Sequence, residues 1–279
     1  MATPTLTRHQ LDGALGEILV DVRAASRTTA QPAVLLLHGF KGFKDYAFLP
    51  VFAERLARAG FVAITASVSG AGVDAAGDFT RLDRFASNTY SKELDDLERV
   101  VGALQRGELQ VAPPTSIGVV GHSRGGGMAL LLARETPAVA AVVTWAGIGK
   151  VRRHTDAELE AWQRLGTITI LHQRLRIRLP LHYDVVADCL AHEDGRLSIP
   201  EAARTLGRPW LQVHGTADTT VTLAEANALA EHAGDALTER LILEDADHTF
   251  GTKHPWGGAS PAMDEVFDAT TRFLARHLR

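Results

Sequence analysis

The chain has 279 residues, of which 46% are hydrophobic and 22% charged, an ordinary composition for a globular protein. Its net charge is −4, so it lacks the basic field that holds a phosphate backbone, and we expect no nucleic-acid partner. The single cysteine, Cys189, excludes an internal disulfide and a multi-cysteine metal cage. Apolar runs such as Ala138–Ala146 are too short to span a membrane, and Met1–Gln10 has no apolar signal-peptide core, so we expect a cytoplasmic protein with no membrane partner.

Short apolar runs alternate with longer amphipathic stretches along most of the chain. This pattern predicts an α/β fold, in which strands of a mostly parallel central sheet are joined by helical crossovers. The expected strands are Ala33–Leu37, Phe61–Val68, Ile117–Val120, Val139–Trp145, Trp210–Val213 and Arg240–Leu243. The expected helices are one carrying the stripe of Leu49, Phe52 and Leu56 and ending at Gly60, followed by Ser91–Gln105, Gly125–Arg134 and Pro261–His277.

The middle of the chain breaks this alternation. We interpret residues 149–206 as a small cap insertion into a core formed by residues 1–148 and 207–279. Thr167–Ile170 and Arg174–Leu179 have a period of two, which predicts a hairpin that turns near His172 and Gln173.

The arginines of this hairpin have two interpretations. Arg174, Arg176 and Arg178 are either ordinary charges on a solvated strand face or they attract an anionic group of a substrate.

The strongest local motif is Gly121-His122-Ser123-Arg124-Gly125, between an expected strand and an expected helix. It matches the nucleophile elbow, a sharp turn that strains the serine backbone and needs small residues two positions on either side so that strand and helix can approach. The motif predicts that Ser123 is a nucleophile. A serine hydroxyl is weak at neutral pH, so it requires a base and a third group that orients the base.

Both partners are expected downstream, in the order serine, acid, histidine. Asp218 follows the strand that begins at Trp210, and His248 follows the last expected strand, so we assign Asp218 as the acid and His248 as the base. Asp245 and Asp247 are rival acids, but they are so near His248 in the chain that we expect them to shape its loop.

The reaction also needs donors for a negatively charged oxygen. The backbone N–H of Arg124, at the start of the helix, and that of Phe40, in the loop after an early strand, are the candidates. The substrate pocket is expected above the carboxyl ends of the strands and under the cap. Trp145, Trp162 and Phe250 are candidates to line it, and packing in the core is the alternative for each.

Four motifs together resemble the α/β-hydrolase superfamily. They are His38–Asp45, the serine elbow, His214–Asp218 and Asp247–Gly251, and they are most similar to a bacterial esterase group near the dienelactone hydrolase, cinnamoyl esterase and acylaminoacyl peptidase branches. The resemblance implies the α/β-hydrolase fold with helices on both faces of the sheet, the Ser123–Asp218–His248 triad and the Phe40 and Arg124 oxyanion-hole amides.

The chain also departs from these branches. Dienelactone hydrolases use a cysteine where this chain has Ser123, and the 37 residues before the first motif leave no room for the propeller of acylaminoacyl peptidases. Cinnamoyl esterases carry an insertion between the serine and the acid, and residues 149–206 would correspond to that insertion.

These observations predict a serine hydrolase of the carboxylesterase type that cleaves small to medium carboxylic esters through an acyl-enzyme. Its expected partner is a small-molecule ester. No cofactor or metal is expected, because the sequence has no zinc-type motif. The same triad also serves a small-peptide or amide hydrolase, a thioesterase or a lactonase, and a non-catalytic binding protein is the remaining alternative. The oligomeric state stays open, a homodimer included.

Overall fold

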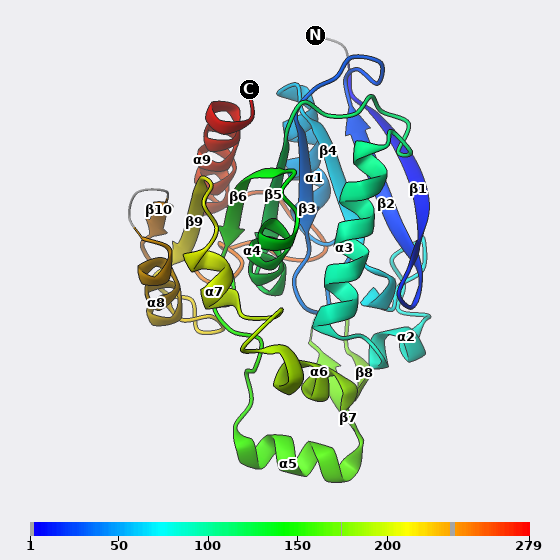
Figure 1. Ribbon diagram of the computed structural model, residues 1–279, viewed down its shortest axis with the longest axis vertical. Coiled ribbons are helices and arrows are strands. Elements are labelled where there is room, and N and C mark those ends of the chain that lie inside the picture. The colour runs from blue at the N-terminus through cyan, green and yellow to red at the C-terminus, as the bar shows by residue number, and fades with distance from the viewer. Residues whose placement is uncertain (1–2, 174, 235–237) are drawn as a thin grey trace.

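A mixed sheet with helices on both faces forms the centre of the computed structural model, which describes residues 3–173, 175–234 and 238–279 (Figure 1). Within these residues the sheet has eight strands in the order β1-β2-β4-β3-β5-β6-β9-β10. Their bounds are β1 (Thr5–Gly13), β2 (Gly16–Ala24), β3 (Ala33–Leu37), β4 (Val62–Ser67), β5 (Ile117–His122), β6 (Val139–Trp145), β9 (Trp210–Gly215) and β10 (Thr238–Leu243). All pairings from β4 to β10 are parallel, which confirms the predicted α/β class and mostly parallel sheet.

Helices cover both faces of the sheet (Figure 1). One face carries α1 (Leu49–Arg58) and α9 (Pro261–Leu278), and the other carries α3 (Tyr90–Gln105), α4 (Arg124–Glu135), α7 (Ile199–Arg204) and α8 (Leu223–Ala233). A short 3-10 helix, η1 (Ser69–Ala71), and α2 (Leu82–Ala86) follow β4. Among the helices of the described ranges, none combines the length and the apolar composition needed to cross a membrane.

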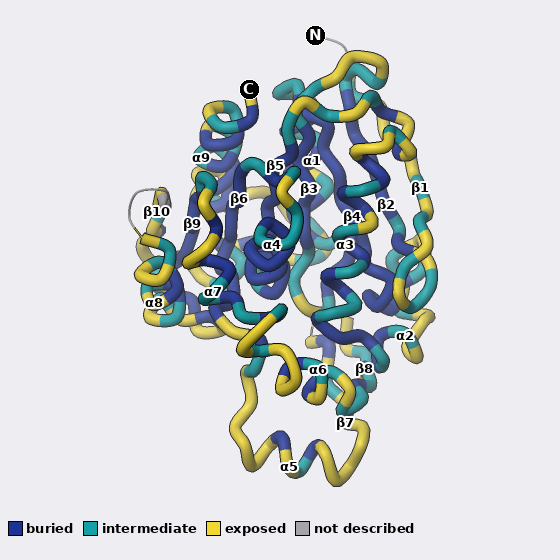
Figure 2. The backbone as a smooth tube through the Cα atoms, in the orientation of Figure 1, coloured by how far each residue is buried: buried dark blue, intermediate teal, exposed yellow. Residues whose placement is uncertain are grey.

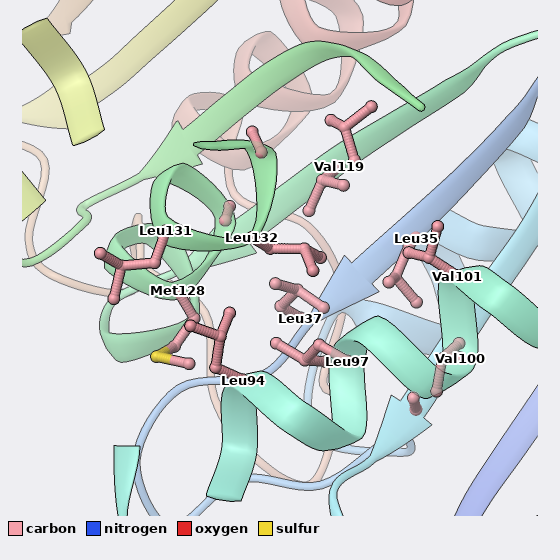
Figure 3. Close-up of a cluster of buried hydrophobic side chains, with 14 of the residues drawn as sticks. Leu35, Leu37, Leu94, Leu97, Val100, Val101, Val119, Met128, Leu131 and Leu132 are labelled. Carbon is pink, nitrogen blue, oxygen red and sulfur yellow. The ribbon is translucent and has the colours of Figure 1, made fainter. Parts of the chain in front are cut away.

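The side chains of β3 show how the sheet holds the two helical layers. Val34 and Leu36 are buried in the cluster under α1 and α9, whereas Leu35 and Leu37 are buried in the cluster under α3 and α4. Figure 3 shows the second cluster, where Leu35 and Leu37 lie against side chains of α3 and α4. A strand that is apolar at every position is buried on both faces, and each such side chain contributes about 1.5–3 kcal/mol. This sheet fixes the strand ends at which the candidate site lies.

The hairpin β1–β2 lies outside the predicted elements. Its strands pair antiparallel, and β2 then pairs antiparallel with β4, so the hairpin extends one edge of the sheet. Ile18, Val20 and Val22 are fully buried at alternate positions, whereas β1 is mostly exposed. Asp21 and Arg23, between and after these residues, are buried as well, so the second half of β2 is covered on both faces.

The segment between β6 and β9 corresponds to the predicted cap. It contains α5 (Asp156–Leu165), β7 (Thr167–His172), β8 (Ile177–His182), α6 (Asp184–His192) and α7. The pair β7–β8 is antiparallel and separate from the main sheet, as the predicted hairpin required, but β8 begins at Ile177, and Arg174 lies outside the described residues. Figure 2 shows α5 as the most exposed part of this segment. By contrast, α7, which lies within residues 149–206, packs on α4 and α8 in the helical layer of the core.

Candidate active site

The elbow between β5 and α4 holds Ser123 in a strained conformation. Ser123 has φ of 56° and ψ of −118°, and its N–H donates a hydrogen bond of 2.9 Å to the Trp145 carbonyl. A Cβ at Gly121 would lie 1.9 Å from the Gly125 carbonyl oxygen, and a Cβ at Gly125 would lie 2.6 Å from the His38 carbonyl oxygen. Only glycine fits at these two positions. The two glycines let β5 and α4 approach each other closely, and this places the serine at the carboxyl end of the central strand.

Three side chains distant in the sequence meet at this point. His248 Nδ1 lies 2.8 Å from Asp218 Oδ2, and His248 Nε2 lies 2.9 Å from Ser123 Oγ. A neutral imidazole whose Nδ1–H donates to the carboxylate has a free lone pair on Nε2 that accepts the serine O–H. The structure therefore joins the predicted acid, base and nucleophile in one hydrogen-bonded chain.

Asp218 is held as a carboxylate by its surroundings. Its Oδ1 accepts hydrogen bonds from the N–H groups of Thr220, at 2.8 Å, and Val221, at 3.0 Å. Burial acts to raise the pKa of Asp218, but the hydrogen bond from His248, the charge of that histidine and the two backbone N–H groups outweigh it, so the pKa lies below its ordinary value. Asp218 is therefore ionised at neutral pH, when it can orient His248 and stabilise its protonated form.

The loop that carries His248 is shaped by the two aspartates that were rival acids. Asp247 Oδ1 accepts hydrogen bonds of 2.9 Å from the N–H groups of Thr249 and Gly251. Asp245, with φ of 56°, donates its N–H to Thr216 Oγ1 at 2.9 Å. Asp247 thus bonds within the loop through its carboxylate and Asp245 only through its backbone N–H, whereas the carboxylate bonded to the His248 ring is that of Asp218.

Phe40 and Arg124 both lie next to Ser123. A Cβ at Gly39, next to Phe40, would be 3.1 Å from Ser123 Cβ, so the loop after β3 passes directly against the serine. Arg124 is the first residue of α4, where backbone N–H groups have no intrahelical acceptor and the helix dipole favours negative charge. Both predicted N–H donors are thus adjacent to the nucleophile.

The Arg124 side chain is buried beside the site. Its Nε lies 3.1 Å from Glu93 Oε2, and its guanidinium carbon lies 3.7 Å from the centre of the Tyr90 ring. Burial acts to lower the pKa of Arg124, but the charge of Glu93, the contributions of Tyr90 and Cys189 and the hydrogen bond to Glu93 together outweigh it, so the pKa lies above its ordinary value. Arg124 therefore remains a paired cation inside the protein.

Two cavities open beside Ser123. The first has a volume of about 240 Å³ and lies between the core and the cap, where Trp162 lines it as predicted. The second has a volume of about 180 Å³ and lies over the loop after β3 and the His248 loop. Ser123 and Phe40 line both cavities.

Trp145 and Phe250 line neither of these cavities, which corrects the expectation that they belong to the pocket. Trp145 is fully buried against the rings of Phe52 and Phe267, and its Nε1–H donates to Thr270 Oγ1 at 2.9 Å. Phe250 is buried in the same cluster. Both side chains point to the face covered by α1 and α9, so they pack in the core.

Two of the hairpin arginines do not reach the site either. Arg176 and Arg178 are exposed and line neither cavity, and Arg174 lies outside the described residues. For the two described residues the structure supports the interpretation as solvated charges.

The sequence profile of the Dienelactone hydrolase family matches residues 20–172, more than half of the chain and the part that contains the serine elbow. The chain belongs to the dienelactone hydrolase family. This membership confirms the resemblance to the α/β-hydrolase superfamily and places the chain in a family of hydrolases. No curated protein sequence matches the chain.

Solved structures share the fold of this family member. Est1E from Butyrivibrio proteoclasticus, solved with ferulic acid bound, has a TM-score of 0.74 at 17% identity, over 96% of this chain and 98% of that one. The dienelactone hydrolase from Anabaena variabilis has a TM-score of 0.64 at 18% identity, over 99% and 100% of the two chains. The α/β hydrolase GrgF from Penicillium sp. has a TM-score of 0.74 at 16% identity, over 98% and 99%. At these identities the similarity shows the common fold.

The structure places further residues near Ser123 that were not predicted from the sequence. Glu93 and Tyr90 hold the Arg124 guanidinium, and Lys41 and His172 line the second cavity. Glu93 lies one turn before Leu97 on the inward stripe of α3, so an acidic residue on an apolar helix face was the available signal.

Proposed function

We propose that this protein is a serine esterase that cleaves carboxylic esters through an acyl-enzyme formed on Ser123. The observation that carries the proposal is the hydrogen-bonded chain from Asp218 through His248 to Ser123 Oγ, which ends where two cavities meet. Such a chain is the arrangement that activates a serine hydroxyl. The proposed substrate is a small-molecule ester. The presence of all three hydrogen-bonded side chains argues against a purely binding role.

The proposed reaction has two steps. In the first, His248 Nε2 takes the hydroxyl proton while Ser123 Oγ attacks the ester carbonyl carbon, and the resulting oxyanion accepts hydrogen bonds from the N–H groups of Phe40 and Arg124. His248 then gives the proton to the leaving alcohol oxygen, and the C–O bond breaks. In the second step, water loses a proton to His248, attacks the acyl-enzyme and releases the carboxylic acid.

A lactonase is the second candidate, favoured by membership in the dienelactone hydrolase family. A lactone is a cyclic ester, so the same proton transfers open it and leave the alcohol attached to the acid. The cysteine nucleophile of dienelactone hydrolases is replaced here by Ser123. The substrate panel must therefore contain a lactone, together with an anilide and a thioester for the amide and thioester alternatives.

The test compares the wild type with Ser123→Ala on p-nitrophenyl esters from acetate to decanoate, methyl ferulate and the compounds named above. We expect ester hydrolysis by the wild type and a loss of about 10³-fold or more in the variant, because Ser123 Oγ is the hydroxyl hydrogen-bonded to the proposed base. A fluorophosphonate probe, followed by peptide mass mapping, should label Ser123.

Cys189→Ala is the matched control, because Cys189 also lines the first cavity and is the one thiol of the chain. Burial raises the pKa of this thiol to about 12, so it stays protonated and is a poor nucleophile. Labelling at Cys189, or a Ser123→Ala variant that keeps its rate, would contradict the proposal.

A further inference from the structure

The two cavities beside Ser123 differ in chemistry. The first is lined mainly by apolar side chains of the cap, namely Leu159, Trp162, Ile168, Ile170, Leu181 and Val186. The second is the more polar of the two, since Lys41, Tyr46, His172, Gln173 and Thr249 take part in its lining. A substrate held across Ser123 therefore meets an apolar wall on one side and a more polar wall on the other.

The cations at the first cavity do not make it a site for an anion. Arg124 is paired with Glu93 at 3.1 Å, and Arg153 is paired with Glu225 at 2.7 Å. Arg152 lies 3.1 Å from a carboxylate oxygen of Asp156 and 3.1 Å from one of Glu193. Because each guanidinium already has a carboxylate partner, the cavity offers its apolar walls to the substrate.

The position of His248 decides which part of the ester enters which cavity. In the proposed reaction His248 must deliver a proton to the oxygen of the leaving alcohol, so that oxygen lies within hydrogen-bond distance of Nε2. His248 lines the second cavity and is not among the residues that line the first. The alcohol must therefore depart through the polar cavity, while the acyl group stays on Ser123 in the apolar one.

We infer that the substrate is an ester of an apolar carboxylic acid with a polar, hydroxyl-bearing alcohol. This inference rests on the proposed function and adds the chemical class of both halves of the substrate. The first cavity, which would hold the acyl group, is the acyl cavity. Its volume of about 240 Å³ is smaller than the roughly 300–1,000 Å³ of sites for drug-sized ligands, so it takes a medium-sized acyl group.

The second cavity, which would hold the alcohol, is the alcohol cavity. Its wall joins the cap to the core. Lys41 Nζ donates a hydrogen bond to the Leu171 carbonyl at 3.3 Å, and His172 Nε2 lies 3.3 Å from the Lys41 carbonyl oxygen. These contacts hold the tip of the β7–β8 hairpin against the loop that carries Phe40. The wall that would face the alcohol is thus fixed relative to the proposed oxyanion hole.

The test uses two isomeric esters, glycerol 1-hexanoate and hexyl glycerate, which contain the same atoms and differ only in which half is polar. Release of acid is followed in a pH-stat, and each kcat/KM is divided by the rate constant of alkaline hydrolysis to remove the difference in intrinsic reactivity. We expect a normalised preference for glycerol 1-hexanoate of about tenfold or more, since misplacing a group in a matched pocket has costs of this order.

One variant probes each cavity. Gln173→Leu removes a polar group from the alcohol cavity and should lower the ratio of kcat/KM for glycerol 1-hexanoate to that for methyl hexanoate. Ile170→Phe fills part of the acyl cavity and should lower the ratio for glycerol 1-hexanoate to that for glycerol 1-acetate. Arg178→Gln is the matched control for both, because Arg178 is exposed on the same hairpin and lines neither cavity. Circular dichroism and thermal unfolding check that all three variants fold.

The outcomes separate this inference from the function on which it rests. Equal rates on the two isomers, a preference for hexyl glycerate, or no activity on either isomer while p-nitrophenyl esters are cleaved would overturn the inference and leave the esterase standing. Absence of turnover on every ester, with no phosphonate label on Ser123, would overturn both.

Discussion

The side chains of Arg124 and Phe40 contact each other, with the guanidinium carbon 5.4 Å from the centre of the phenyl ring. These are the two residues whose N–H groups we propose as the oxyanion hole. The contact links the start of α4 to the loop after β3, the two segments that lie next to Ser123. The buried Glu93 holds Arg124 in this position.

Replacing Arg124 by Met should be strongly destabilising. The change leaves the Glu93 carboxylate buried without its cation, which costs about 3–5 kcal/mol of unfolding free energy. Urea unfolding measures the loss. The double variant Arg124→Met/Glu93→Gln removes both charges and should recover part of it, and equal stability of the single and double variants would count against this account of the pair.

Asp218→Asn should lower kcat by about 10⁴-fold, because an amide at this position favours the wrong tautomer of His248. Asp247→Asn is the matched control, since its amide oxygen can still accept the hydrogen bonds of Thr249 and Gly251. Steady-state kinetics with a p-nitrophenyl ester measures both. Comparable losses in the two variants would show that Asp218 is not the orienting acid.

The pKa of Asp218 also makes a prediction about acid stability. Because the pKa in the folded protein lies below the ordinary value of 3.8, the carboxylate stabilises the fold at any pH above that value. This contribution disappears as the pH falls from about 3.8 through the lower pKa of the folded state. Urea unfolding at a series of pH values should show a shallower fall in stability for Asp218→Asn than for the wild type over this range, and parallel curves would exclude the linkage.

Gly121→Ala should damage the elbow itself. A Cβ at this position would lie 1.9 Å from the Gly125 carbonyl oxygen, so the backbone around Ser123 must move. A displacement of about 1 Å at a reacting group costs about 10²-fold in rate. Gly195→Ala is the control, because its Cβ would meet its nearest neighbour at 3.8 Å, an ordinary contact. Unchanged kcat/KM in Gly121→Ala would contradict the close-packed turn.

The two tryptophans near the site should behave differently. Trp145→Phe removes the donor to the buried Thr270 hydroxyl and should cost about 1–3 kcal/mol of stability without altering the acyl-chain preference. Trp162→Phe changes the wall of the first cavity and should alter that preference. Thermal unfolding and the chain-length profile on p-nitrophenyl esters measure the two effects. A changed profile in Trp145→Phe would place this residue in the pocket after all.

Residues whose chemistry requires a particular local turn were accessible from the sequence. The spacing around Ser123, and the places of Asp218 and His248 after late strands, predicted residues that the structure brings into hydrogen-bond distance. The buried strands and long amphipathic helices were equally readable, because their periodicity reflects which side chains face the core.

Contacts that depend on tertiary packing were not accessible. Nothing in the order of residues pairs Glu93 with Arg124, and the pairing exists because α3 and α4 lie side by side on the sheet. An aromatic residue at the end of β6 does not disclose which face of the sheet it will occupy, so Trp145 looked like a pocket residue. The polar strand β1 has too weak an alternation to reveal the hairpin that it forms with β2.

The wide separation of the three side chains along the sequence has a consequence for the protein during its synthesis. His248 is added 125 residues after Ser123. At a translation rate of 5–20 residues per second, about 6–25 seconds pass between the two. Throughout this time the serine has no base, and its hydroxyl is no more reactive than that of any other serine. In the proposed mechanism the triad is therefore complete only after the edge strand β10 and the loop with His248 have joined the sheet.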